Sequence, residues 1–230
     1  MTEGSKLPSR RDAVRLKNAR RLSTSSQRWL QRQLNDPYVA AAKAQGWRSR
    51  AAFKLSELDE KYGLISKAAR VVDLGAAPGG WSQVALARGA AKVVGIDLLA
   101  IEPVTGAAFI QGDFLEAGME ARLVEMLGGK ADLVLSDMAP NTSGHVATDH
   151  LRIMALAETA LAFACDILAP GGAFVAKLFQ GGAEKDMLNT LKSRFKTVRH
   201  AKPPASRKDS KEMYVVAMGF RPAHDSQGQA

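Results

Sequence analysis

The chain has 230 residues, of which 46% are hydrophobic and 24% charged, a balance typical of a globular protein with room for one sizeable core. Its single cysteine, Cys165, excludes a disulfide framework and a cysteine-rich metal site. No apolar run reaches the roughly 18 residues of a membrane span, and the basic start of the chain lacks the apolar core of a secretory signal. We therefore expect a cytoplasmic protein without membrane contact.

Positive charge is concentrated at the two ends of the chain. Residues 1–50 carry 12 Lys/Arg against 3 Asp/Glu, residues 51–191 carry 11 against 17, and residues 192–230 carry 9 against 3, so the segments contribute +9, −6 and +6 to the net charge of +9. Such a distribution favours a polyanionic partner, because a cation near a phosphate gains from the release of counterions. Nucleic acid is the expected partner, and an anionic membrane surface is the alternative.

The N-terminal part begins as a polar stretch and then becomes helical. Residues 1–25 are rich in Arg, Lys and Ser with few apolar anchors, which predicts a basic, disordered arm. Between residues 48 and 62 apolar side chains recur at helical spacing from Ala52 to Tyr62, and Gly63 closes the segment. A helix is expected over this segment.

Strands and helices alternate from residue 70 onward. Apolar strands are predicted at 70–74, 92–96, 107–110, 131–136 and 173–177, and helices at 79–88, 116–127, 148–168 and 184–195. Two late strands, 197–201 and 213–219, follow one another without a helix, so the last one should run antiparallel. The pattern predicts an α/β fold with a seven-stranded, mostly parallel sheet, one antiparallel strand, and helices on both faces.

The segment VVDLGAAPGGWSQ joins the first of these strands to a helix through a turn built on Gly75, Gly79 and Gly80. Glycine lets a ligand approach the backbone closely, and a helix start offers unpaired N–H groups. The spacing is not G-x-G-x-x-G, and Pro78 removes one N–H that a pyrophosphate would use. The absence of G-x-x-x-x-G-K-[ST] excludes a P-loop nucleotide hydrolase.

Three aspartates, Asp97, Asp113 and Asp137, follow the ends of successive strands. Asp97 lies 22 residues beyond Gly75 (97 − 75 = 22), a spacing from which a carboxylate binds ribose hydroxyls, and Asp113 is placed to accept from an adenine amino group. Each alone could be a helix cap or turn residue. Together with the glycine turn they favour a nucleoside cofactor without phosphates, and carboxylates suit the cationic groups of S-adenosylmethionine.

The clearest catalytic candidate is Lys177, which ends an apolar strand at the sheet edge where the cofactor is expected. A lysine there is unfavourable unless it is paired or functional. Lys54, taken alone, is typical of a solvated helix residue.

Six segments resemble, in order, the FtsJ (RrmJ, or RlmE) family of ribosomal RNA 2′-O-methyltransferases: RSRAAFKL, VVDLGAAPGGWSQ, QGDF, SDMAPNTSG, LAPGGAFVAKLFQG and SRKDSKEMYVVA. The resemblance implies a Rossmann-like, S-adenosylmethionine-dependent methyltransferase domain over residues 26–220, followed by a polar tail at 221–230. It implies a catalytic tetrad made of Lys54, Asp137, Lys177 and Glu212. It also implies cofactor contacts at Gly79, Trp81, Asp97, Asp113 and Asp137. The implied substrate is the ribose 2′-hydroxyl of a uridine in the A loop of 23S rRNA, on the assembled large subunit, and a monomer is the default expectation.

A ribose hydroxyl is a weak nucleophile that benefits from a base. We assign Lys177 as this base, with Lys54 and Asp137 orienting it and Glu212 holding a lysine or the hydroxyl. Trp81 either stacks on adenine or packs in the core. No metal is needed, and the histidines lack metal-ligand spacing.

Basic residues interleaved with aromatic ones near the N-terminus suit RNA backbone and stacked bases: Arg28, Arg32, Arg48 and Arg50 with Trp29, Tyr38 and Trp47. The basic segment 192–211 could line the other side of the same RNA. Two alternatives stay open: an RNA-binding or ribosome-assembly factor with a vestigial cofactor site, and a methyltransferase that acts on tRNA or on an mRNA cap ribose.

Overall fold

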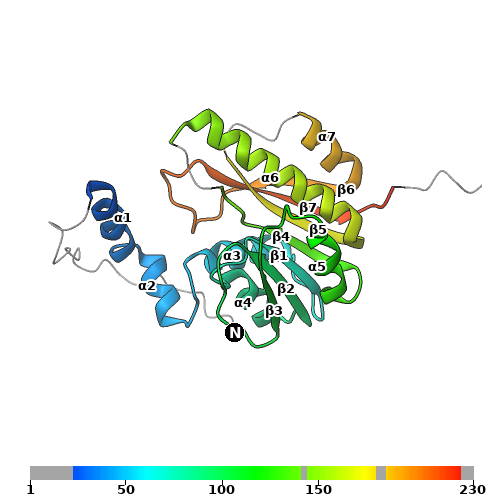
Figure 1. Ribbon diagram of the computed structural model, residues 1–230, viewed down its shortest axis with the longest axis horizontal. Helices are drawn as coiled ribbons and strands as arrows, with labels where there is room; N and C mark the ends of the chain where they lie inside the picture. The colour runs from blue at the N-terminus through cyan, green and yellow to red at the C-terminus, as the bar shows by residue number, and fades with distance from the viewer. Residues whose placement is uncertain (1–22, 141–143, 180–184, 224–230) are drawn as a thin grey trace, which may run out of the picture.

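The computed structural model describes residues 23–140, 144–179 and 185–223 (Figure 1). Most of the expected basic arm and polar tail lies outside these residues, as do residues 141–143 of the motif SDMAPNTSG. The described part is built around one seven-stranded sheet with the order β3-β2-β1-β4-β5-β7-β6. The strands are β1 (Arg70–Leu74), β2 (Lys92–Asp97), β3 (Ala107–Gln111), β4 (Ala131–Ser136), β5 (Leu168–Phe179), β6 (Phe195–Ala201) and β7 (Glu212–Phe220).

The direction of the strands confirms the expected topology. β1 to β5 pair in parallel, whereas β7 lies between β5 and β6 and is antiparallel to both. A parallel sheet places the carboxyl ends of its strands at one edge, and an antiparallel strand brings its amino end to the same edge. Glu212, at the start of β7, therefore lies beside Phe179, at the end of β5.

Helices cover both faces of the sheet, and this explains why the central strands are mostly apolar. The helices α3 (Ala51–Tyr62) and α4 (Gly80–Ala87) pack on one face, and α5 (Met119–Leu127), α6 (Val146–Ile167) and α7 (Lys185–Arg194) pack on the other (Figure 1). Neighbouring residues of a strand point to opposite faces. Val71 packs in the apolar cluster beneath α3 and α4, and Val72 packs in the cluster beneath α5, α6 and α7; both side chains are fully buried. None of the helices in the described part is long and apolar enough to cross a bilayer.

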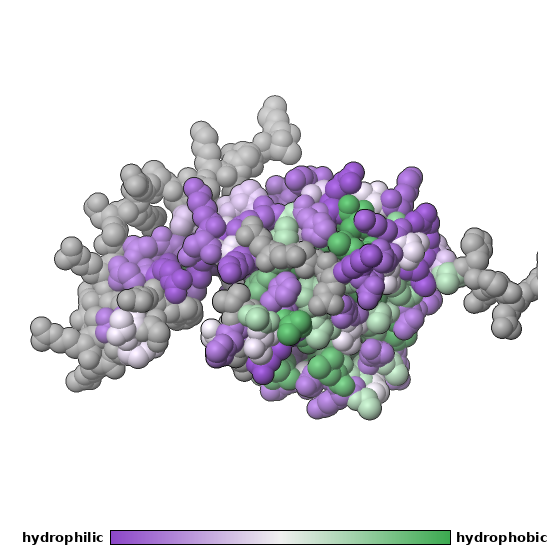
Figure 2. All heavy atoms as spheres, turned by 90° about the horizontal axis from the view of Figure 1, so that it is seen from above, coloured by the Kyte–Doolittle hydropathy of each residue, from purple (hydrophilic) through white to green (hydrophobic). Residues whose placement is uncertain are grey.

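Two short helices, α1 (Thr24–Leu34) and α2 (Pro37–Ala44), precede this body and were not expected from the sequence. Ser23 caps α1 by accepting from the Ser26 backbone N–H, and Asp36 caps α2 by accepting from that of Tyr38. Hydrophilic residues gather at the left of the view in Figure 2, on the side of the molecule where these helices lie. The side chains of Arg28 and Trp29 lie outside the described part of the structure.

The strand expected at 173–177 is longer, because β5 begins at Leu168 directly after α6 ends. The Pro-Gly-Gly segment at 170–172, which we expected to separate helix from strand, lies inside β5. Leu168 pairs with Ala131 and Ala173 with Leu133, with a register shift between the two pairs, and Gly171 takes a φ of +84°. The irregular stretch lies at the opposite end of β5 from Lys177.

Candidate active site

The glycine turn after β1 forms the floor of the candidate active site. The backbone N–H groups of Gly75 and Ala76 both donate to the Ile96 carbonyl, at 2.9 and 3.0 Å, which folds the turn against the end of β2. Gly75 has a φ of +76°, and a Cβ there would lie 2.9 Å from the Met138 backbone. Gly79 precedes α4 with a φ of +103°. Only glycine suits such positions, and the turn can therefore let a ligand approach the start of α4.

The predicted cofactor aspartates lie at the same sheet edge as this turn. Asp97 ends β2, and its two carboxylate oxygens accept from the backbone N–H groups of Ala77 and Leu99, each at 2.9 Å. Asp97 thus ties the glycine turn to the loop after β2. Asp113, beyond β3, accepts from the Leu115 N–H at 2.9 Å. Each carboxylate has further lone pairs for a ligand, so the cofactor roles of both remain predictions that the geometry permits.

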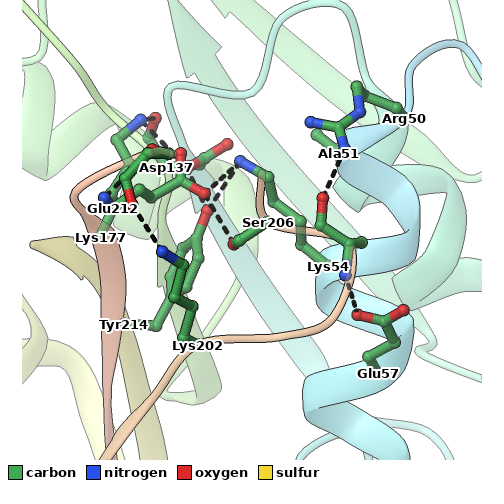
Figure 3. A network of polar contacts seen from close by, with 12 residues as sticks. Arg50, Ala51, Lys54, Glu57, Asp137, Lys177, Lys202, Ser206, Glu212 and Tyr214 are labelled. Carbon is green, nitrogen blue, oxygen red and sulfur yellow. Dashed lines mark hydrogen bonds and ion pairs between the residues drawn. The ribbon is translucent and has the colours of Figure 1, made fainter. Parts of the chain in front are cut away.

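The four proposed catalytic residues form two close pairs, drawn together in Figure 3. Lys177 Nζ lies 3.1 Å from Asp137 Oδ1 and donates to the Asp137 carbonyl at 2.6 Å. Lys54 Nζ lies 2.6 Å from Glu212 Oε1. Both lysines are only 8% exposed, so their ammonium groups are held by carboxylates and not by bulk water. The lone-residue interpretation of Lys54 as a solvated surface charge is wrong for this structure.

Tyr214 joins the two pairs and was missed by the sequence analysis. Its hydroxyl donates to Asp137 Oδ1 at 2.9 Å and accepts from Lys54 Nζ at 3.2 Å. It lies opposite Lys177 in the β5–β7 register and two residues after Glu212. Residues i and i+2 of a strand share a face, and this spacing was the available signal. A continuous polar chain therefore runs from Lys177 through Asp137, Tyr214 and Lys54 to Glu212.

Electrostatics fix the protonation states of Asp137 and Tyr214, which lie in the middle of this polar chain. Burial by itself would raise the pKa of Asp137, but the ammonium groups of Lys177 and Lys54 and the hydrogen bonds from Lys177 and Tyr214 outweigh it and hold the pKa below its usual value. Burial, together with the carboxylates of Asp137 and Glu212, raises the pKa of Tyr214 well above its usual value. At neutral pH Asp137 is a carboxylate acceptor and Tyr214 a neutral phenol donor.

A second buried carboxyl, that of Asp73, lies below the glycine turn at the end of β1. Ser82 donates its hydroxyl to Asp73 Oδ2 at 2.7 Å, and among the described residues Oδ1 has no hydrogen-bond partner. Burial raises the pKa of Asp73 to about 7, and the nearby carboxylates of Asp137 and Asp97 add to the rise. From the sequence, Asp73 was recognised only as part of the motif VVDLGAAPGGWSQ.

Trp81 belongs to the core in this structure. It is 3% exposed, its indole N–H donates to the Ala51 carbonyl at 2.8 Å, and its ring lies 5.7 Å from that of Tyr214. These contacts support the packing alternative for its side chain. A contact between Trp81 and the cofactor stays a prediction.

Several of the predicted RNA-facing residues have partners inside the molecule. The Arg48 guanidinium donates to three carbonyls, those of Pro78, Glu102 and Pro103, which join the glycine turn to the loop after β2. The Tyr38 hydroxyl donates to Glu57 at 3.2 Å. Arg48 and Tyr38 therefore have structural roles. In the described residues no three His, Cys, Asp or Glu side chains are grouped as metal ligands.

This sheet order, with a glycine turn after β1 and acidic residues at the ends of the next strands, defines the class of Rossmann-like methyltransferases. Residues 47–220 match the family model for FtsJ-like methyltransferases, and the chain belongs to this family. It is 72% identical to the ribosomal RNA large subunit methyltransferase E of Granulibacter bethesdensis over 209 residues, 91% of each chain, and 71% identical to the protein of the same name from Acidiphilium cryptum over 222 residues, 96% of this chain and 99% of the relative. A solved ribosomal RNA methyltransferase from Plasmodium falciparum aligns with a TM-score of 0.68 and 33% identity over 76% of this chain and 98% of that one.

Proposed function

We propose that the chain transfers the methyl group of S-adenosylmethionine to the ribose 2′-hydroxyl of a uridine in the A loop of 23S rRNA, within the assembled large subunit. The names of the relatives support a ribosomal RNA substrate. The observation that carries the proposal is the buried polar chain that links Lys177, Asp137, Tyr214, Lys54 and Glu212 at the edge of the glycine turn. We further propose that the enzyme works as a cytoplasmic monomer.

The residues at this edge fit the cofactor. The glycine turn leads into the start of α4, Asp97 and Asp113 offer carboxylates for the nucleoside, and Asp137 adds a negative charge that suits a cationic ligand. S-adenosylmethionine supplies a methyl group that its sulfonium has already activated. The protein must then align the acceptor and manage one proton.

Lys177 is the proposed base. In its neutral form it would accept the proton of the ribose hydroxyl, and the resulting ammonium would be stabilised by Asp137, whose carboxylate and carbonyl both lie within 3.1 Å of Nζ. A second cation, Lys54, lies on the other side of Tyr214 and donates to its hydroxyl. Glu212 holds Lys54 in place.

Unmethylated large ribosomal subunits incubated with the protein and tritiated S-adenosylmethionine test this function. We expect label in one uridine of 23S rRNA, attached to the ribose. Lys177→Ala should abolish transfer and leave cofactor affinity nearly unchanged, whereas the control Lys92→Ala, at the exposed amino end of β2, should remain active. Label in tRNA or in a cap ribose would assign another acceptor, and binding without transfer would favour an assembly factor.

A further inference from the structure

A polar cavity of about 430 Å³ opens on the side of the candidate active site that faces the N-terminal helices. It lies between α1, the start of α3 and the segment that joins β6 to β7. Its lining includes Arg32, Arg50, Lys54, Arg207, Ser210 and Glu212. We call this cavity the arginine pocket. It shares Lys54 and Glu212 with the proposed catalytic chain, so whatever occupies it lies next to the reacting group.

The arginine pocket attracts anions. Four of its lining residues are Lys or Arg, and two, Asp209 and Glu212, are acidic. Lys54 and Glu212 neutralise each other at 2.6 Å, and Asp36 lies within 3.5 Å of Arg50 and Arg207. The three arginines against Asp209 and Asp36 then leave one net positive charge for a ligand. Guanidinium groups bind phosphates with two parallel hydrogen bonds, which makes arginine the typical residue for phosphate recognition.

Contacts within the protein hold Arg50 and Arg207 in place before any ligand arrives. Asp36, whose side chain is only 8% exposed, lies behind them at 2.9 Å from Arg50 Nε and 3.5 Å from Arg207 Nη2. Arg50 also donates to the Ala205 carbonyl at 2.6 Å, and the Ala205 N–H donates to Glu57 at 2.7 Å. Figure 3 shows Arg50 and Glu57 on α3 beside the segment that carries Ser206. A guanidinium has five N–H donors, so these contacts leave donors for the pocket.

The size of the pocket fits a single nucleotide, because ligand cavities commonly measure roughly 300–1,000 Å³. The polar lining does not favour an apolar molecule. We propose that the arginine pocket binds the nucleotide next to the target ribose on the same RNA strand, and that Arg32 and Arg207 bind its phosphate. This proposal rests on the proposed function, because it identifies a substrate subsite of that enzyme.

The arginine pocket is tested with the full-length protein and unmethylated large subunits. Arg207→Gln and Arg32→Gln should each raise KM for the subunits about tenfold, with kcat within about twofold of the wild-type value and cofactor affinity unchanged. The plot of log KM against log salt should become shallower by about one unit for each variant. Arg122→Gln removes an exposed cation on α5, outside the pocket, and should change neither quantity.

Asp36→Asn separates phosphate binding from a merely structural role of Arg207. Asparagine keeps the helix cap and the shape of the side chain but removes the charge that pairs with Arg50 and Arg207. If Arg207 binds phosphate, KM for the subunits should be no higher than in the wild type. If Arg207 only anchors the segment before β7, the variant should raise KM as Arg207→Gln does, and the proposal would be overturned.

The two proposals fail in different ways. A wild-type protein that methylates the subunits while Arg32→Gln and Arg207→Gln leave KM and the salt dependence unchanged would refute the arginine pocket alone. A wild-type protein that transfers no methyl group to the subunits would refute the proposed function, and the pocket proposal with it. Melting temperatures of all variants show whether each one folds.

Discussion

Replacing Asp73 by Asn tests the electrostatics beneath the glycine turn. In the wild type the carboxyl is fully buried, with one oxygen bonded to Ser82 and the other without a partner among the described residues. Burial raises its pKa from 3.8 to about 7. The folded protein therefore holds this proton more tightly than the unfolded chain, and folding loses stability as the pH rises from about 4 to about 7.

The size of the effect follows from the two pKa values. Between pH 5 and pH 8 the titration of Asp73 should remove roughly 2–3 kcal/mol from the free energy of unfolding. Asp73→Asn cannot titrate and should lack this loss. The lowered pKa of Asp137 acts in the opposite direction, because its contribution disappears only as the pH falls below about 4. The titration of Asp137 therefore lies outside the range from pH 5 to pH 8.

Urea unfolding at pH 5 and at pH 8, for the wild type and for Asp73→Asn, measures this difference directly. Comparing the change between the two pH values in each protein cancels the static cost of the substitution and the titration of the histidines that both proteins share. We expect the wild type to lose roughly 2–3 kcal/mol more than the variant. The same change in both proteins would show that Asp73 does not titrate in this range, and the reasoning from its burial would be wrong.

Tyr214→Phe removes the hydroxyl between Lys54 and Asp137 and should lower kcat roughly 10- to 100-fold, since hydrogen bonds to charged groups contribute about 1.5–3 kcal/mol; cofactor affinity, measured by calorimetry, should not change. Gly75→Ala should weaken cofactor binding and destabilise the fold by about 1–3 kcal/mol, because its Cβ would meet the Met138 backbone. Gly63→Ala is the matched control, with a similar φ and open space, and normal affinity is expected. Deleting residues 1–22, which carry seven Lys/Arg and two Asp/Glu, should weaken RNA affinity and flatten its salt dependence in filter binding; unchanged affinity would contradict an electrostatic role.

The central strands could be predicted from the sequence because burial on both faces makes them mostly apolar. The expected strands at 70–74 and 131–136 have the bounds of β1 and β4. The beginning of β5 could not be predicted, since Pro170 and two glycines usually mark a break, and only the pairing of Leu168 with Ala131 makes this segment a strand. Helix α1 has a polar sequence and α2 has only eight residues, so their signals, Ser23 and the Asp36-Pro37 cap, are weak without a long apolar face.

The candidate site was predictable where one residue was out of place in its own segment. Lys177 at the end of an apolar strand is such a residue, and it lies at the expected sheet edge, beside Asp137. Tyr214 was not recognised because an aromatic residue in an apolar strand is usually core, and its partners come from α3 and from the end of β4. For Arg207, composition predicts charge but gives no information about the Asp36 behind it.

The position of β7 has a consequence for the order in which the molecule is assembled. β7 is the last strand in sequence, yet it lies inside the sheet and is hydrogen-bonded on both sides. During synthesis the N-terminal part can fold first, so the glycine turn and β1 to β4 can form while β6 still lacks its neighbour. Lys54 and Asp137 meet Tyr214 and Glu212 only when residues 212–220 insert. We therefore expect the proposed catalytic residues to come together only when the final strand is in place.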